Sequence, residues 1–157
     1  MEYPDSAYRG FSASDCICQY DGHPIISDAA FQFDRPRDCD GLSECSINWN
    51  DDDESLVDIA RRTKKATGEH QFKAGAGLLS KSLLNNLKVK YLPFFDYERR
   101  DVDGTNRYHG NLLINEGNPK PPPFLKRRLQ GELAQNAEYL TREELDQVET
   151  SFCGKCK

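Results

Sequence analysis

The chain has no excess of positive charge and no long apolar run. It carries 21 Lys and Arg against 26 Asp and Glu, a net charge of −5 at pH 7. General nucleic-acid binding needs a positive field that displaces counterions, so this balance argues against a nucleic-acid partner. No apolar stretch approaches the roughly 18 residues that cross a membrane, and the first residues lack the basic and apolar regions of a signal peptide. We therefore expect a cytoplasmic protein with no membrane partner.

The sequence also lacks the local motifs of several enzyme classes. It has no G-x-S-x-G elbow around a serine and no phosphate-binding Walker loop. Gly75 and Gly77 begin a G-x-G-x-x-G-like pattern, but Ser80 stands at the third glycine position. The acidic run 51–54 lacks the spacing of a calcium loop and is explained as the cap of a helix. No complete catalytic set is visible.

Local patterns predict an α+β fold: a mixed or antiparallel sheet with one or two packed helices and a C-terminal helical appendage. Capping residues and helical spacing predict a helix over 53–66 and a short helix capped by Ser80. The polar stretch 96–107 is predicted to be a loop, and the Asp-Gly pairs at 21–22 and 103–104 to be turns. Apolar runs bounded by turn residues predict strands at 7–11, 29–34, 45–49, 72–78, 88–95 and 108–115.

The proline run at 119–123 predicts an extended break, because proline fixes φ and removes a backbone donor. We expect an α+β domain over 1–118 and, over 119–157, two helices and a Cys-x-x-Cys tail. A capping box of Thr141 and Glu144 begins the second helix. The first helix carries apolar residues at every fourth position, namely Leu125, Leu129, Leu133 and Ala137.

The basic stretch Lys126, Arg127 and Arg128 lies opposite the leucines of the first C-terminal helix. Such a face is usually solvated. The alternative is that it docks on an acidic partner or a phosphate backbone.

Cysteine spacing makes zinc the candidate cofactor. Cys153 and Cys156 have the two-residue spacing that lets both thiolates reach one tetrahedral ion. The other two ligands would be Cys39 and Cys45, with Cys16 and Cys18 as the alternative pair. Neither pair has the usual spacing, since the first is too loose and the second too tight. The alternative is a cysteine-bearing terminus with reduced thiols, which a cytoplasmic location favours.

The first third of the chain interleaves polar with apolar residues. Arg9 lies centrally in a predicted strand, where its guanidinium can clamp a phosphate or carboxylate, or pair with an acid on a solvated face. His109 precedes a late strand, next to Gly110, which allows a ligand or another backbone to come close. Its imidazole is a candidate general base, or a partly buried group bonded to a loop carbonyl. We take Arg9, Ser46 and His109 as the candidate catalytic residues, and Ser27 and His23 as ligand-binding.

The order of these elements resembles a loosely defined set of small bacterial and phage proteins with no established activity. The resemblance covers about residues 7–115 and brings no known function. It is carried by an opening strand with Arg9, the Gly-x-Pro and Ser-x-Ala-Phe elements at 22–24 and 27–31, the Leu-Ser pair at 42–43, and the late His109.

A more remote likeness is to ADP-ribosyltransferase-like toxin folds. In those folds an arginine or histidine on the first strand grips the dinucleotide, a serine or tyrosine lies on a middle strand, and an acidic residue, the third role, lies later in the chain. The likeness implies these roles for Arg9 and Ser46, but no glutamate motif matches the third role.

Three functions follow as expectations. The first is a protein-interaction component of a prokaryotic or phage multi-protein system, such as a defence or toxin operon. The second is an enzyme acting on a nucleotide or phosphate ligand through Arg9, Ser46 and His109, which requires that the three side chains converge on one pocket. The third is a zinc-stapled binding module.

Overall fold

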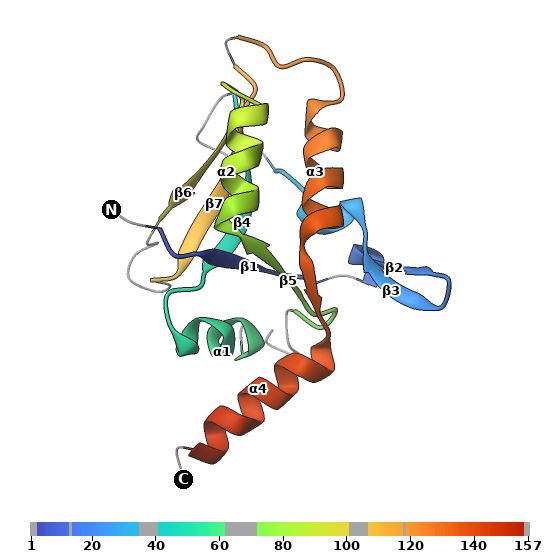
Figure 1. The fold of residues 1–157 in the computed structure, drawn as a ribbon, viewed down its shortest axis with the longest axis vertical. Helices are drawn as coiled ribbons and strands as arrows, with labels where there is room; N and C mark the ends of the chain where they lie inside the picture. Colours follow the sequence, from blue (N-terminus) through green and yellow to red (C-terminus); the bar gives the residue numbers. More distant parts are fainter. Residues whose placement is uncertain are drawn as a thin grey trace.

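The computed structural model describes residues 3–12, 14–34, 41–61, 72–100, 107–117 and 119–155 (Figure 1). The predicted α+β class is confirmed. A six-stranded antiparallel sheet has the strand order β6-β7-β4-β1-β5-β8, and a two-stranded hairpin, β2-β3, lies beside it. In chain order the elements are β1 (Ser6–Gly10), η1 (Ser14–Cys16), β2 (Ile17–Tyr20), β3 (His23–Ile26), η2 (Asp28–Phe31), β4 (Leu42–Trp49), α1 (Asp53–Arg61), β5 (Ala76–Ser80), α2 (Lys81–Lys90), β6 (Phe95–Arg99), β7 (His109–Asn115), α3 (Leu125–Asn136), β8 (Glu138–Leu140) and α4 (Arg142–Lys155).

Consecutive side chains of the central strand β1 enter two separate hydrophobic cores. Ala7 lies in the larger core, to which α2, α3 and η2 contribute. Tyr8 lies in a smaller core with Ile59 of α1 and Leu145 of α4. Because neighbouring residues of a strand point to opposite sides of a sheet, the two cores lie on opposite faces. Figure 1 shows α2 and α3 side by side, with α1 and α4 grouped below them.

The local signals that begin helices are confirmed. The Leu83 N–H donates to Oγ of Ser80 at 3.1 Å, which caps α2. The Glu144 N–H donates to Oγ1 of Thr141 at 3.1 Å, one half of the predicted capping box. Helix α1 begins at Asp53, and its described part ends at Arg61. The strands predicted at 7–11, 45–49 and 108–115 are confirmed within β1, β4 and β7.

The strand predicted over 29–34 is wrong, because its first half belongs to the short 3₁₀ helix η2, which ends at Phe31. Ser27 is the N-cap of η2, and its Oγ accepts a hydrogen bond from the Ala29 N–H at 3.1 Å. This bond satisfies a donor that the first turn of a helix leaves without a partner, while Ala30 and Phe31 are buried. The cap and the burial together outweigh the β propensity of the segment.

The strand predicted over 88–95 is also wrong, since helix α2 continues to Lys90. Leu84 and Leu87 are buried and hold the helix against the core. The next strand, β6, begins at Phe95, the last residue of the predicted strand, and continues to Arg99, inside the stretch 96–107 predicted to be a polar loop. It pairs with β7 and buries Phe95. A short alternation of polar and apolar residues does not distinguish a strand from the exposed end of a helix.

Two smaller differences concern strand positions. The strand predicted over 72–78 begins later, at Ala76, because residues 72–74 form a turn. The hairpin β2-β3 surrounds the predicted turn at Asp21 and Gly22, although no strands are predicted there. Both turn residues have positive φ, 53° and 79°, as a two-residue type I′ turn requires.

The residues after the proline run join the body of the fold. The two predicted helices are confirmed as α3 and α4. Leu129 and Leu133 of α3 are fully buried in the larger core, and β8 pairs with β5 at one edge of the sheet. The predicted division into 1–118 and 119–157 stays a prediction, and residues on both sides of it share one core.

Replacing Gly110 by alanine tests how closely β7 packs against its neighbours. A Cβ at this position would overlap the indole Nε1 of Trp49 and the carbonyl oxygen of Glu98. We expect Gly110→Ala to lower the free energy of unfolding by about 2–3 kcal/mol, measured by urea denaturation. Gly131→Ala is the control, since its Cβ would come no nearer than 3.9 Å to Asp28 and alanine favours a helix. Small effects at both positions would contradict the tight packing.

Candidate functional site

The guanidinium of Arg9 joins three elements of the fold. Its Nε donates to the carbonyl oxygen of Ala30 at 2.7 Å, and its Nη1 donates to the carbonyl oxygen of Ser46 at 2.8 Å. These bonds connect β1 to η2 and to β4. Two of the three guanidinium nitrogens that a ligand clamp would use therefore donate to the backbone.

The strand register separates the three candidate catalytic side chains. The pairings of β4 with β1 and β7 place Ser46 and His109 on the face of the sheet that carries Tyr8. Arg9 is the next residue after Tyr8 in β1 and points to the opposite face. The contact between Arg9 and Ser46 uses the Ser46 carbonyl, and the Ser46 side chain is exposed. The structure does not bring the three side chains into one pocket.

The two candidate ligand-binding residues lie at the hairpin and at η2. Ser27 caps η2, whose Ala30 carbonyl receives Arg9, so the Ser27 hydroxyl is used by the backbone. His23 is exposed and lies opposite Tyr20, next to the turn of the hairpin. The structure therefore places Ser27 in a structural role and leaves His23 at the surface.

Of the four candidate zinc ligands, Cys45 is the one whose side chain is described. Burial in the larger core raises the pKa of its thiol to about 11, although nearby Arg9 lowers it in part. Zinc binds a thiolate, so these surroundings disfavour Cys45 as a ligand. Cys39, Cys156 and the side chain of Cys153 lie outside the described residues. Within the described part of the chain no group of three or more His, Cys, Asp or Glu could hold a metal ion, and zinc stays a prediction.

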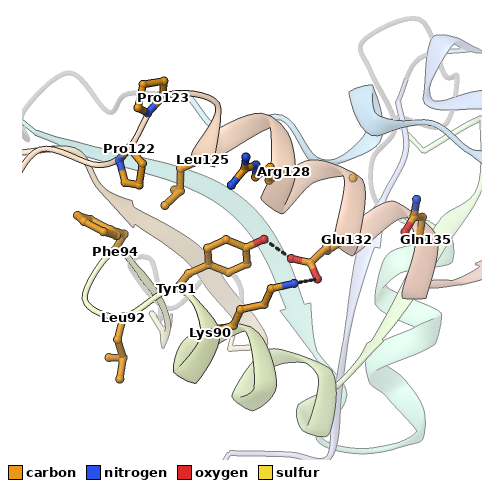
Figure 2. A pocket seen from close by; sticks show the side chains of 11 residues that line it. Lys90, Tyr91, Leu92, Phe94, Pro122, Pro123, Leu125, Arg128, Glu132 and Gln135 are labelled. Carbon is orange, nitrogen blue, oxygen red and sulfur yellow. Dashed lines mark hydrogen bonds and ion pairs between the residues drawn. The ribbon is translucent and has the colours of Figure 1, made fainter.

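A cavity of 760 Å³ lies between α2 and α3, at a place that the sequence analysis does not single out (Figure 2). Its volume is in the range of ordinary ligand sites. We call it the α2–α3 groove. Its lining combines apolar side chains with a few polar ones, and consists of Lys90, Tyr91, Leu92, Phe94, Pro122, Pro123, Leu125, Arg128, Gly131, Glu132 and Gln135.

Glu132 is the centre of a hydrogen-bond network in the groove. Its Oε1 accepts from Nζ of Lys90 at 2.7 Å, and its Oε2 accepts from the hydroxyl of Tyr91. Burial alone would raise the pKa of the Glu132 carboxyl, but the hydrogen bonds from Lys90 and Tyr91 outweigh it and lower the pKa. Burial and the hydrogen bond to Glu132 raise the pKa of Tyr91, so its phenol stays protonated at neutral pH. The network ties the end of α2 to α3.

Arg128 supplies the uncompensated positive charge of the groove. Lys90 already forms an ion pair with Glu132. Arg128 is exposed, and its guanidinium makes no hydrogen bond or ion pair with another described residue. Figure 2 shows it on α3, between Leu125 and Glu132. A guanidinium can bind a carboxylate through two parallel N–H donors.

Large exposed apolar side chains gather at the same end of the molecule. Val89, Leu92 and Phe124 are 72%, 62% and 70% exposed. Phe124 also has a φ of 66°, in the left-handed region, which costs a non-glycine residue roughly 1–2 kcal/mol.

Two further hollows adjoin the groove. One, of 560 Å³, shares Pro122 and Leu125 with it and is also lined by Phe124 and Arg127. Another, of 480 Å³, shares Phe94 with it. Together the three hollows make a long, partly apolar surface at the end of α2, along the proline run and at the start of α3.

Two sequence signals bear on the groove. Arg128 belongs to the basic stretch for which docking on an acidic partner is one alternative, and the proline run supplies one wall. The hydrogen bond between Tyr91 and Glu132 has no signal in the sequence, because the two residues are 41 positions apart in the chain.

No family model, curated protein or solved structure matches this chain. The resemblance to small bacterial and phage proteins and the likeness to ADP-ribosyltransferase-like toxins therefore stay predictions. In the described residues, no helix combines the length and apolar character that crossing a bilayer requires. Function has to be argued from the groove itself.

Arg9→Met tests whether Arg9 serves the fold. The substitution leaves the carbonyls of Ala30 and Ser46 without their donor, so we expect the free energy of unfolding to fall by about 2 kcal/mol. Ser46→Ala removes only an exposed hydroxyl and should change stability by less than about 0.5 kcal/mol. Urea denaturation of both variants measures the difference. A neutral Arg9→Met would show that these bonds do not hold the fold.

Glu132→Gln tests the link between α2 and α3. The folded-state pKa of Glu132 lies below its unfolded value, so its stabilisation is present above about pH 4.3 and is lost as the pH falls through the folded pKa. We expect the substitution to cost about 1–2 kcal/mol at pH 7, with the gap to the wild type closing toward pH 3. Urea denaturation across this range measures it. The exposed Glu138→Gln is the control, and a gap independent of pH would contradict the argument.

Proposed function

We propose that this chain is a protein-interaction component and that its α2–α3 groove binds an extended segment of a protein partner. The segment carries an apolar side chain next to a carboxylate. A prokaryotic or phage multi-protein system, such as a defence or toxin operon, is the setting that the sequence favours, and it forms part of the proposal. The observation that carries the proposal is an apolar hollow with the unpaired Arg128 at its side.

The residue types of the groove suit protein binding. Aromatic residues and arginine are enriched at the centres of interfaces, because each combines a large contact area with a directed polar group. Tyr91, Phe94 and Arg128 supply these types here. Exposed Leu92 and Phe124 extend the apolar area beyond the groove.

The walls of the groove favour an extended segment. Pro122 and Pro123 form one side, and proline has little backbone freedom to lose when a ligand binds. Tyr91 is held by Glu132, so a second wall is fixed before binding. A site that needs little reordering keeps more of its contact energy as affinity.

The charges favour a single carboxylate over a nucleotide. The Glu132 carboxylate lies within the groove and would repel the several negative charges of a polyphosphate. A single carboxylate of the partner can pair with Arg128, which occupies a different position on α3 from Glu132. The separation of Arg9 from Ser46 and His109 on the two faces of the sheet likewise weighs against the nucleotide enzyme.

Selection from a random peptide library displayed on phage tests the proposal. We expect the wild-type chain to enrich peptides with an apolar residue next to Asp or Glu. The Arg128→Glu variant should bind those peptides at least about tenfold more weakly, because it replaces the carboxylate's partner with a like charge. Selection against Arg128→Glu should instead enrich Lys or Arg at the acidic position. Titration of synthetic peptides measures the affinities.

Arg127→Glu is the matched control. Arg127 is the neighbouring arginine of α3, but it lines the adjoining hollow and not the groove. We expect this variant to keep the affinity of the wild type within about twofold. Failure to enrich any peptide, or an equal loss in the two variants, would contradict binding in the groove.

A further inference from the structure

The hairpin β2-β3 presents a face without Asp, Glu, Lys or Arg and an edge that no other described strand pairs with. Cys18, Tyr20, His23 and Ile25 alternate onto one of its faces, and all four are exposed, Tyr20 at 71% and Ile25 at 46%. Within the described residues β2 pairs with β3 alone. A two-stranded hairpin is marginally stable unless further strands or a helix support it. This surface shares no residue with the α2–α3 groove, so pairing through it is independent of the proposed function.

The register shows which backbone groups of β2 point outward. Tyr20 and His23 flank the two-residue turn, so they form a hydrogen-bonded pair. The Ser27 N–H donates to the Cys16 carbonyl at 2.7 Å, which continues the same alternation at the other end. In antiparallel strands hydrogen-bonded and non-hydrogen-bonded pairs alternate. The N–H and C=O groups of Ile17 and Gln19 therefore face away from β3.

The two edges of the hairpin are not equivalent. Pro24 lies opposite Gln19, and its outward position on β3 carries no N–H donor. Strand β3 therefore offers a broken ladder to an added strand. Strand β2 offers a complete one, with donors at both Ile17 and Gln19.

We propose that two copies of this chain pair antiparallel through the open edge of β2. One register uses both outward residues of each copy: Ile17 pairs with Gln19 of the second copy, and Gln19 with Ile17, around a twofold axis at Cys18. This pairing makes four backbone hydrogen bonds and a continuous four-stranded sheet. Both copies contribute the same edge, that of β2, as a twofold dimer requires.

The side chains of the hairpin permit this pairing. Neither β2, with the sequence ICQY, nor β3, with HPII, contains an acidic or basic residue other than His23. The residues that pair, 17–19, are uncharged in both copies, and Asp15 and Asp21 lie beyond the paired residues. Edge strands that avoid pairing usually carry charged residues or proline, and β2 has neither.

Sedimentation velocity over a range of protein concentrations tests the dimer. We expect the wild type to associate reversibly. Gln19→Pro removes one outward donor in each copy without touching a bond within the hairpin, so it should weaken the dimer about thirtyfold. Gln19→Ala keeps the donor and should dimerise as the wild type does. Urea denaturation verifies that Gln19→Pro remains folded.

Oxidative cross-linking reports the register. The two Cys18 residues would form a non-hydrogen-bonded pair with Cα atoms about 4.5 Å apart, within disulfide range. With Cys39, Cys153 and Cys156 replaced by serine, copper phenanthroline as oxidant should join the two Cys18 thiols, and Cys18→Ser should abolish the product. A monomer at all concentrations, a dimer that Gln19→Pro leaves intact, or a dimer that does not cross-link through Cys18 would overturn the proposal.

Discussion

The burial of one leucine stripe on α3 is the interaction on which the groove depends. Leu125, Leu129 and Leu133 occupy every fourth position, and all three are buried in the larger core. Burying a leucine side chain contributes roughly 1.5–3 kcal/mol, so the stripe outweighs any single polar contact nearby. Once the stripe faces the sheet, the rotation of α3 is determined. Arg128 and Glu132 then lie along the groove, while Arg127 lies along the hollow on the other side.

The polar residues of the first third of the chain serve mainly the fold. Arg9 bridges two backbone carbonyls on different elements, and Ser27 caps η2, which provides one of those carbonyls. An arginine among apolar residues has to satisfy its donors, and nearby carbonyls do so as well as a ligand does. A dense mixture of polar and apolar residues is therefore as typical of a packed junction as of an active site. The surface that suits binding is instead the α2–α3 groove with the hollow beside it, where apolar side chains such as Leu92 and Phe124 stay exposed.

Sequence reasoning succeeds here where neighbouring residues decide the outcome. The caps of Ser80 and of Thr141 with Glu144 are local, and so is the turn of Asp21 and Gly22, since each depends on residues within three positions. It fails where packing chooses between two local preferences. The segment 29–34 became a 3₁₀ helix through capping and burial. The segment 88–95 became the end of a helix and a turn, because α2 was already held by its buried leucines.

Contacts between residues close in the chain were thus enough to predict where α1, α2 and α4 begin, the caps of α2 and α4, and the leucine period of α3. Tertiary structure alone decided the order of the strands and the face on which each side chain lies. It separated Arg9 from Ser46 and His109, and it brought Tyr91 next to Glu132 across 41 residues. The physical reason is that strand pairing and helix docking depend on which apolar surfaces can be buried together. That is a property of the whole chain and not of any one segment.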